Sequence, residues 1–140
     1  MPQFMPDLIT YRSNIKITAD DFVDLLKRST LDARRPVDQP ERIQRMLDHA
    51  NVVVTAWSGE RLVGVSRAVT DFSFCCYLSD LAVDARFQHQ GIGKELVTLT
   101  HEAAGMETML ILLAAPAATE YYPKIGMTRF QHCFIRDRKK

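Results

Sequence analysis

The sequence predicts an α+β domain in which helices flank a mixed, mostly antiparallel central sheet. Three strand-like segments follow one another between residues 52 and 83, and short connections of this kind join antiparallel strands. A helical segment then leads to a further apolar segment at residues 109–114, and a connection of that length is typical of a parallel crossover. The 140 residues suit a single domain over residues 1–140, able to bury a core without metals or crosslinks.

The predicted elements begin with a strand and a helix. Residues 10–13 carry a mixture of polar and apolar side chains that fits a first strand. In the segment TADDFVDLLKRS, Thr18 followed three residues later by Asp21 resembles a capping box and predicts a helix start. The residues that share one face of this helix are Phe22, Leu25, Leu26 and Ser29.

A second helix is predicted shortly afterwards. Asp38 and Glu41 give another cap signal, and Pro40 suits the first turn of a helix. The apolar residues at helical spacing in this segment are Ile43, Met46, Leu47 and Ala50. The loop between the two helices contains Arg34 and Arg35, which we expect to be exposed.

The centre of the chain has the composition of strands. Residues 52–57 and 62–69 are rich in β-branched residues and flank the turn SGER, which predicts an antiparallel hairpin. Residues 74–83 continue the pattern as a third strand. A helix that ends near Gly105 follows, and its apolar residues at helical spacing are Ile92, Leu96, Leu99 and Ala103.

The last part of the chain is predicted as strand, short helix and strand. The continuous apolar run MLILLA at residues 109–114 is typical of a strand covered on both faces. Pro116 begins a short helical segment that extends to about Ile125, and TRFQHCFIR at residues 128–136 is predicted as a final strand. The expected order is therefore β-α-α-β-β-β-α-β-α-β, with about four helices.

Composition excludes several classes of protein. The chain is 46% hydrophobic and 25% charged with a net charge of +1, so nothing indicates a nucleic-acid or membrane partner. No apolar run approaches a membrane span and the N-terminus lacks a leader-like sequence, which predicts a cytoplasmic protein. The three cysteines, Cys75, Cys76 and Cys133, fit neither a disulfide framework nor a metal site, and we expect buried or half-buried free thiols.

The segment RFQHQGIGKELV at residues 86–97 predicts an anion-binding site. Gly91 and Gly93 precede a helix whose first amides are unpaired and whose dipole is positive at that end. A Walker loop would need glycine at position 88 and serine or threonine at 95, and a dinucleotide fingerprint would need glycine at 96. The chain has glutamine, glutamate and leucine at these positions, so neither motif is present.

What the segment does match is Gln88-x-x-Gly91-x-Gly93, the Q/R-x-x-G-x-G/A signature of the GCN5-related N-acetyltransferase (GNAT) superfamily. The sequence resembles this superfamily from about residue 10 to residue 135, most specifically between residues 77 and 126. In the superfamily a tyrosine commonly lies four residues before a Gly-Phe pair, and Tyr122 with Gly126-Met127 is similar. Met127 departs from the usual phenylalanine.

The resemblance implies acetyl-CoA as cosubstrate and no metal. Its pyrophosphate would be bound by the loop, and its pantetheine arm would pair with the backbone of the fourth strand at Leu81, Ala82 and Val83. Alternatively, the glycines form a tight turn without a ligand, Lys94 is solvated, and Leu81 and Val83 are core residues. The implied loop residues are Gln88, His89, Gln90, Gly91, Ile92, Gly93 and Lys94.

The resemblance also implies catalytic residues. Tyr122 is the candidate general acid for the departing thiolate, with Tyr121 as the competitor. Asp80, the nearest carboxylate to the predicted reaction centre, is the candidate general base, and the alternative is that it is a strand-bulge residue or a hydrogen-bonding residue. Asp71, Glu120 and His89 are weaker base candidates, and a chain of water molecules is another proton path.

The expected function is that of an acetyl-CoA-dependent N-acetyltransferase. A primary amine would attack the donor directly in a ternary complex, since both substrates can be held together. A homodimer through the last strand or an exposed helix is a further expectation, and Arg34 and Arg35 offer an alternative role in attracting an acidic acceptor. The competing interpretation is a non-catalytic acyl-CoA-binding sensor or regulatory module, which would have no need of Tyr122.

Overall fold

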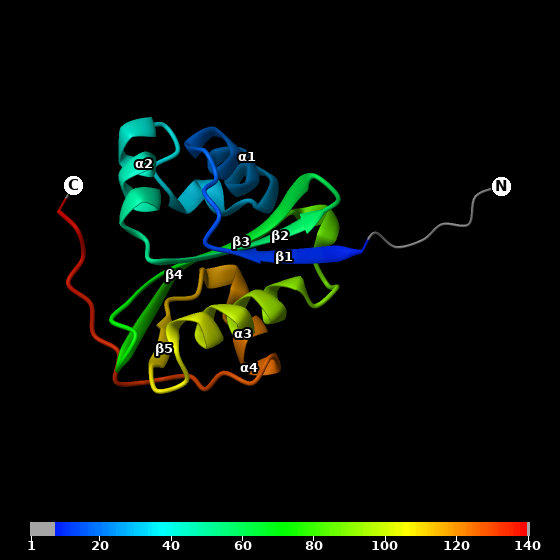
Figure 1. Cartoon of the computed structure of the whole chain (residues 1–140). Coiled ribbons are helices and arrows are strands. Elements are labelled where there is room, and N and C mark those ends of the chain that lie inside the picture. Colours follow the sequence, from blue (N-terminus) through cyan, green and yellow to red (C-terminus); the bar gives the residue numbers. More distant parts are fainter. Residues whose placement is uncertain (1–7, 140) are drawn as a thin grey trace.

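The computed structural model describes residues 8–139 as a five-stranded sheet with helices on both faces (Figure 1). Residues 1–7, which carry the expectation of no leader sequence, and Lys140 lie outside the described residues. The strands are β1 (Ile9–Ser13), β2 (Val52–Ser58), β3 (Arg61–Thr70), β4 (Cys75–Val83) and β5 (Met109–Leu112). The helices are α1 (Ala19–Ser29), α2 (Pro40–His49), α3 (Ile92–Ala104) and α4 (Tyr121–Lys124), with 3₁₀ turns η1 (Leu31–Arg34), η2 (Ala85–Phe87) and η3 (Pro116–Ala118).

The sheet has the order β1-β2-β3-β4-β5. The first four strands are antiparallel to their neighbours, and β5 pairs with β4 in parallel through the crossover helix α3. The predicted mixed, mostly antiparallel sheet with flanking helices is therefore confirmed. None of the helices within residues 8–139 is long and apolar enough to cross a bilayer.

The first two helices begin in different ways. The Thr18 hydroxyl accepts a hydrogen bond from the Asp21 amide at 3.0 Å, so the predicted cap of α1 is confirmed. Its buried residues are the four predicted from helical spacing. The cap predicted at Asp38 is wrong, because α2 follows Gln39, which makes no side-chain capping bond. The start signals that remain are Pro40 and Glu41 in the first turn.

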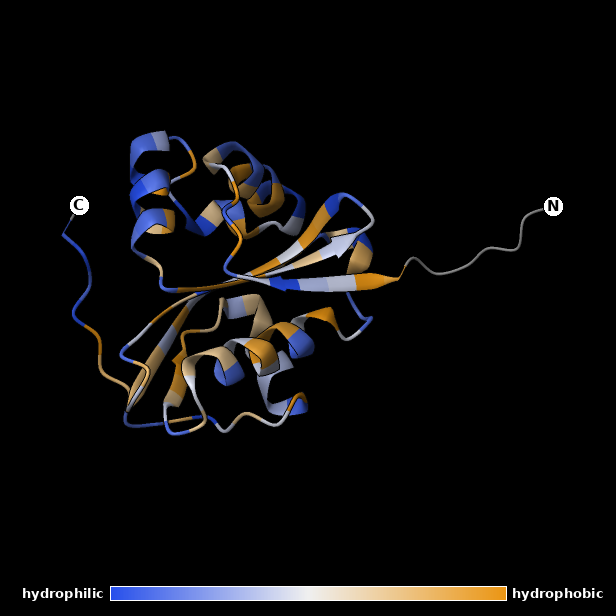
Figure 2. Cartoon of the chain, in the orientation of Figure 1, coloured by the Kyte–Doolittle hydropathy of each residue, from blue (hydrophilic) through white to orange (hydrophobic). Residues whose placement is uncertain are grey.

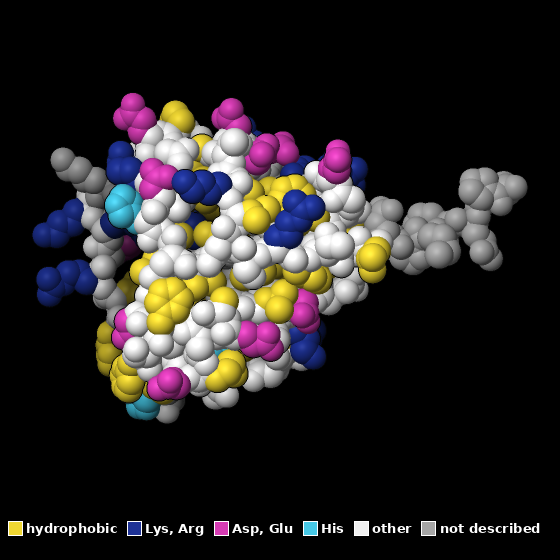
Figure 3. All heavy atoms as spheres, in the orientation of Figure 1, with side chains coloured by type: hydrophobic (Ala, Val, Ile, Leu, Met, Phe, Trp, Pro, Cys, Tyr) yellow, Lys and Arg dark blue, Asp and Glu magenta, His cyan; other side chains and the backbone are white. Residues whose placement is uncertain are grey.

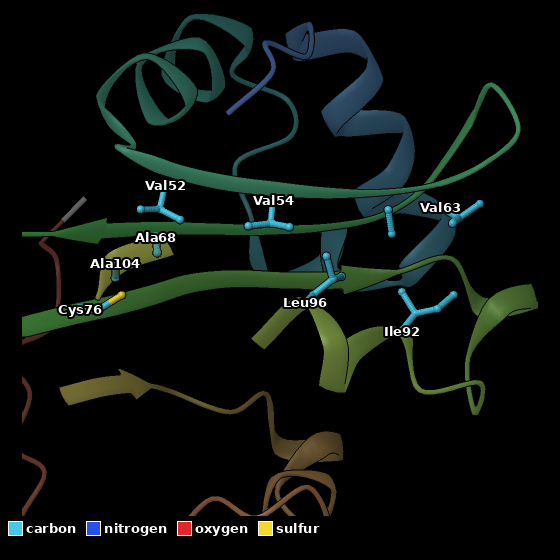
Figure 4. Close-up of a cluster of buried hydrophobic side chains, with 9 residues drawn as sticks. Val52, Val54, Val63, Ala68, Cys76, Ile92, Leu96 and Ala104 are labelled. Carbon is cyan, nitrogen blue, oxygen red and sulfur yellow. The ribbon is translucent and has the colours of Figure 1, made fainter. Parts of the chain in front are cut away.

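Two hydrophobic cores lie on opposite faces of the sheet. Figure 1 places α1 and α2 on one face and α3 and α4 on the other. Ile92 and Leu96 of α3 point toward the strands (Figure 4) and pack with residues such as Val54 and Cys76. Phe22 of α1 packs against the other face with Ala82 of β4.

A bulge in β4 decides which face each of its side chains occupies. Arg67 of β3 is opposite Asp80, whereas the next residue, Ala68, is opposite Leu78, so Ser79 is an extra residue without a partner. Cys76 therefore belongs to the α3 core and Ala82 to the α1 core, although they are six positions apart and would share a face in a regular strand. After the bulge, Asp80 faces the same side as Arg67.

Three further sequence predictions fail, two of them near the C-terminus. The 109–114 run is not covered on both faces, since Met109 and Ile111 are 61% and 46% exposed on the last strand of the sheet. The strand predicted at residues 128–136 is absent, because that segment pairs with no neighbour in the described structure. All three cysteines are free, but only Cys76 is buried, and Cys75 and Cys133 are exposed.

In Figure 2 β5 is hydrophobic, whereas α2 is largely hydrophilic and buries only Ile43.

Candidate active site

The C-terminal half of β4 has an open backbone edge. Parallel pairing with β5 ends at Leu78 opposite Leu112, whereas β4 continues to Val83. Within residues 8–139, residues 80–83 therefore pair with β3 alone. Strands that separate in this way leave backbone donors and acceptors for another extended chain.

The antiparallel register shows which backbone groups point to the open edge. The Asp84 amide donates to the Val63 carbonyl at 2.8 Å, so Val83 and Gly64 form a pair that is not hydrogen-bonded. By alternation, the N–H and C=O groups of Leu81 and Val83 point away from β3, and those of Ala82 point toward it. The Gln88 amide side chain already donates to the Val83 carbonyl at 3.1 Å. The Leu81 and Val83 amides remain as donors at this edge.

Asp84 fixes the turn that leads from β4 to α3. This buried carboxylate accepts from the Arg86 amide at 2.9 Å and from the Arg28 guanidinium at 2.7 Å. Burial alone would raise the pKa of Asp84, but these hydrogen bonds and the charge of Arg28 lower it to about 2. The turn is therefore tied to α1 by a charged hydrogen bond. The sequence analysis did not identify this role of Asp84.

The glycine loop presents unpaired backbone amides. Gly91 caps α3 with a φ of +83°, a conformation that favours glycine, and a side chain there would meet nothing within 4 Å. The Ile92 side chain is buried in the core, so only its backbone can serve a ligand. Gln90 and Lys94 are exposed, and His89 has a positive φ of 65°. The amides that have no acceptor within the described chain are those of His89, Gln90, Gly91, Ile92 and Gly93.

Tyr121 lies against the first turn of α3. Its hydroxyl occupies the space that a Cβ at position 93 would need, so Gly93 is required for this contact. Burial raises the pKa of Tyr121, and a hydrogen bond from the Lys94 amide opposes that rise. Tyr121 therefore belongs to the glycine loop, a placement that its position in the sequence did not reveal.

Tyr122 is held by the turn that ends α4. Gly126 has a φ of +95°, which lets the chain reverse so that the Met127 amide donates to the Tyr122 carbonyl at 3.0 Å. This reversal explains the spacing between the tyrosine and the Gly-Met pair. Burial and the neighbouring Tyr121 raise the pKa of Tyr122 to about 12, and the charge of Arg35 acts in the opposite direction. The Tyr122 phenol therefore keeps its proton at neutral pH.

Asp80 is enclosed by two arginines. One of its carboxylate oxygens accepts from Arg35 and the other from Arg67, and the Asp80 side chain has no exposed surface. Arg35 also donates to the Ser79 carbonyl at 2.6 Å. The expectation that Arg35 lies in an exposed loop is wrong, because its side chain is only 19% exposed.

Arg67 completes this cluster from β3. It donates to the Met46 carbonyl of α2 at 3.1 Å and to the Ser79 hydroxyl at 3.2 Å. A lone arginine in the middle of an apolar strand was the available sequence signal for a buried ion pair. The cluster joins the residue after η1, α2 and the bulge of β4, and the charge of Arg35 acts on the pKa of Tyr122.

The family comparison accounts for this combination of an open strand edge and a glycine loop. A sequence profile described as the acetyltransferase (GNAT) family matches residues 19–127. The chain belongs to the GNAT acetyltransferase family. A relative from Prochlorococcus marinus, named as an uncharacterized N-acetyltransferase ycf52-like protein, is 28% identical over an alignment of 103 residues that covers 69% of this chain. The chain spans 55% of the length of that curated relative.

Solved GNAT structures share the fold. A GNAT family acetyltransferase from Streptococcus pneumoniae TIGR4 superposes with a TM-score of 0.77 at 21% identity, covering 95% of this chain and 100% of that one. The aminoglycoside N-acetyltransferase AAC(6')-Iy, solved in complex with CoA, gives a TM-score of 0.72 at 15% identity. That match covers 97% of this chain and 98% of the other. At these identities the comparison establishes a common architecture.

The remaining base candidates of this GNAT protein lie away from the open edge or are exposed. Asp71 accepts hydrogen bonds from the Ser73, Phe74 and Cys75 amides, which lower its pKa to about 2, at the opposite end of β4. Glu120 is exposed and pairs with Arg129 at 2.8 Å. Among residues 8–139, no group of three or more His, Cys, Asp or Glu side chains is arranged to hold a metal ion.

Proposed function

We propose that this chain, acting as one domain, is an acetyl-CoA-dependent N-acetyltransferase that acetylates a primary amine by direct attack in a ternary complex. The observation that carries the proposal is the set of unpaired amides from His89 to Gly93 at the N-terminus of α3. Unpaired amides at the positive end of a helix dipole form a site for phosphate groups. The CoA complex of the aminoglycoside N-acetyltransferase, a protein of the same fold, supports this choice of donor.

The residues of the site fit an extended donor that starts at the loop and follows β4. The backbone from Gln88 to Lys94 would bind the pyrophosphate, and the open space around Gly91 admits its oxygens. Leu81 and Val83 would pair with the pantetheine amides, as in the addition of a strand to a sheet edge. The Ala82 backbone faces β3, so its role is to hold that edge in place. Acetyl-CoA supplies an activated acetyl thioester.

Val83 and Tyr122 are the proposed donors at the reacting atoms. The Val83 amide would donate to the thioester carbonyl oxygen, where negative charge develops during attack. Tyr122 would donate to the departing sulfur. With a pKa of about 12, complete proton transfer to a sulfur whose reference pKa is near 8.5 would be uphill by roughly three pKa units. We therefore assign Tyr122 a hydrogen-bond donor role that stabilises the departing thiolate.

We assign Asp80 a positioning role in place of general base. Both of its oxygens are engaged by guanidinium groups, and no part of the side chain reaches solvent. Asp80 holds Arg35 at the Ser79 carbonyl, where the charge of Arg35 acts on the pKa of Tyr122. The amine would lose its proton to water, so the rate should rise with pH toward the pKa of the amine, about 10.4 for a lysine-like acceptor.

The test of donor binding is a thermal shift with CoA. CoA at about 100 times its dissociation constant should stabilise the folded protein by about 2.7 kcal/mol. Gly91→Val should weaken CoA binding by about tenfold or more, because a β-branched side chain resists a positive φ and would fill the space next to the loop. An unchanged melting temperature at millimolar CoA would refute the proposed function.

The test of catalysis measures thiol release from acetyl-CoA across a panel of primary amines. Tyr122→Phe should lower kcat by about 100-fold while leaving CoA affinity within about threefold. Tyr77→Phe is the matched control, since Tyr77 lies on the part of β4 that pairs with β5. CoA binding without thiol release from any amine would favour a non-catalytic acyl-CoA sensor.

A further inference from the structure

Two guanidinium groups share one carboxylate at the bulge of β4. Arg35 and Arg67 both pair with Asp80, and within residues 8–139 neither arginine pairs with a second carboxylate. The cluster therefore keeps one unit of positive charge. Asp80 cannot accept a further partner, because it is fully buried and a guanidinium group engages each of its oxygens. An anion that approached this partly buried charge would be attracted more strongly than in water.

Arg35 is the member of the cluster that a ligand can reach. The Arg67 side chain is only 9% exposed, about half the value for Arg35. Each terminal nitrogen of a guanidinium group carries two N–H groups. Nη1 of Arg35 donates to the Arg34 carbonyl at 2.8 Å, and Nη2 donates to the Ser79 carbonyl at 2.6 Å. Within the described chain, one N–H group on each terminal nitrogen of Arg35 therefore has no acceptor.

Arg35 lies where the open edge of β4 begins. Pairing of β4 with β5 ends at Leu78 opposite Leu112, and the next carbonyl, that of Ser79, accepts from Arg35. Arg35 belongs to the connection between α1 and α2, on one face of the sheet, whereas Tyr122 belongs to α4 on the other face (Figure 1). The charge of Arg35 nevertheless acts to lower the pKa of Tyr122. Side chains from both layers therefore influence the same part of the edge.

The proposed reaction brings the acceptor to this place. Tyr122 is the proposed hydrogen-bond donor to the departing sulfur, and the carbon that the amine attacks is bonded to that sulfur. An amine in position to attack therefore carries its other substituents close to Tyr122, within the influence of the Arg35 charge. A carboxylate is the substituent that suits Arg35, because a guanidinium group binds both oxygens of a carboxylate with two parallel N–H groups.

The surface around α1 and α2 offers no broad field of one sign that could make the same selection. The net charge of the chain is +1, and Figure 3 shows acidic and basic side chains interspersed where Figure 1 places these helices. Arg34 is exposed, and within residues 8–139 its side chain makes no ion pair. Exposed charges of this kind are screened by salt. Selection of an acceptor by charge would therefore depend on Arg35.

We propose that the acceptor is a primary amine that also carries a carboxylate, and that Arg35 binds this carboxylate through its two unused N–H groups. The inference rests on the proposed function and names the acceptor class for the same site. The amine nitrogen forms the new bond to the acetyl carbon, the carbon–sulfur bond breaks, and the carboxylate is unchanged in the product. Arg35 is thus a specificity-determining residue that holds the acceptor away from the reacting atoms.

The test compares amines that differ only in the carboxylate. The acceptors are glycine, β-alanine and γ-aminobutyrate, each measured beside its own primary amide, and the readout is kcat/KM for thiol release from acetyl-CoA. The three acids differ in the separation between the amine and the carboxylate, which allows for different distances to Arg35. For at least one separation, we expect the acid to be preferred over its amide by about tenfold or more.

Three variants locate the group that makes the selection. Arg35→Gln should lower the acid-to-amide ratio of kcat/KM by about tenfold or more. Both acceptors are measured on one preparation, so any loss of folded protein cancels in this ratio. Arg35→Lys keeps the charge without the planar pair of donors and should retain only part of the preference. Arg34→Gln is the matched control, because it removes an equal charge from the neighbouring exposed side chain, and it should leave the ratio within about twofold.

The results separate this inference from the proposed function. Acetylation of the amides or of carboxylate-free amines at rates equal to or above those of the acids would overturn the inference, and acetyl transfer itself would stand. A preference that survives Arg35→Gln, or one that Arg34→Gln abolishes, would assign the selection to another group and overturn it as well. Absence of thiol release with every amine would refute the proposed function, and the assignment of Arg35 with it.

Discussion

Replacing Asp80 with asparagine tests the buried cluster and the role of this carboxylate together. Asp80→Asn removes the charge that compensates Arg35 and Arg67, and the new amide N–H group would face a guanidinium donor. Breaking a buried ion pair by removing one partner costs about 3–5 kcal/mol. In the variant, Arg35 can still donate hydrogen bonds to the Ser79 and Arg34 carbonyls, and Arg67 can still donate to the Met46 carbonyl. We therefore expect a cost at the lower end of this range.

The measurement is urea unfolding followed by circular dichroism, together with the melting temperature. A loss of about 3 kcal/mol corresponds to a decrease of about 10 °C in the melting temperature of a domain of this size. Asp24→Asn is the matched control, since Asp24 also pairs with an arginine at 2.9 Å but its side chain is 67% exposed. Asp24→Asn should lower the free energy of unfolding by less than about 0.5 kcal/mol.

Two results would refute this reasoning. A free energy of unfolding for Asp80→Asn within about 1 kcal/mol of the wild-type value would show that the two buried arginines do not need the Asp80 charge. Asp80 would instead be identified as a general base if the folded variant showed two changes. Its kcat/KM would fall by more than about 100-fold, and its plot of kcat/KM against pH would no longer decrease on the acidic side. A positioning residue should leave the shape of that profile unchanged.

Two further predictions concern the loop between β4 and α3. The pKa of Asp84 is lowered from 3.8 to about 2, so its ionised form stabilises the fold at neutral pH by about 2 kcal/mol, and this is lost as the pH falls from about 5 through 2. Urea unfolding at several pH values should therefore show a shallower acid dependence for Asp84→Asn, and an unchanged slope would contradict the assignment. Gly93→Ala should cost about 1–3 kcal/mol because its Cβ would collide with the Tyr121 hydroxyl, and Tyr121→Phe should recover part of that loss in thermal unfolding. Failure of the double variant to recover stability would place the strain elsewhere.

Local signals in the sequence were enough to predict most of the fold. The face of α1 follows from the spacing of Phe22, Leu25 and Leu26, and these residues are buried because that stripe can contact only one layer. Gly91 indicated the start of α3, because a positive φ before a helix favours glycine. These features depend on neighbours within a few residues, which is why the sequence alone reveals them.

The features that were missed depend on residues far apart in the chain. Asp80 meets Arg35 from 45 positions away, and the pairing needs the extra residue at Ser79, which the alternation of apolar residues does not reveal. The apolar run of β5 was predicted to be covered because composition shows hydrophobicity but not position in the sheet. The final strand at residues 128–136 has suitable residues, yet strand formation also requires a partner.

The unpaired Ser79 shifts the phase of β4 by half a period. Before Ser79 in the chain, even-numbered side chains such as Cys76 pack on the side of α3. After Ser79, even-numbered side chains such as Ala82 pack on the side of α1. Deleting this one serine would restore strict alternation and leave the Asp80 carboxylate on the side of the arginines, because Leu78 and Asp80 already lie opposite the consecutive residues Ala68 and Arg67. The deletion would instead remove the carbonyl that accepts from Arg35 and the hydroxyl that accepts from Arg67. The extra residue therefore supplies two additional acceptors to the guanidinium groups, which a regular strand could not offer at this place.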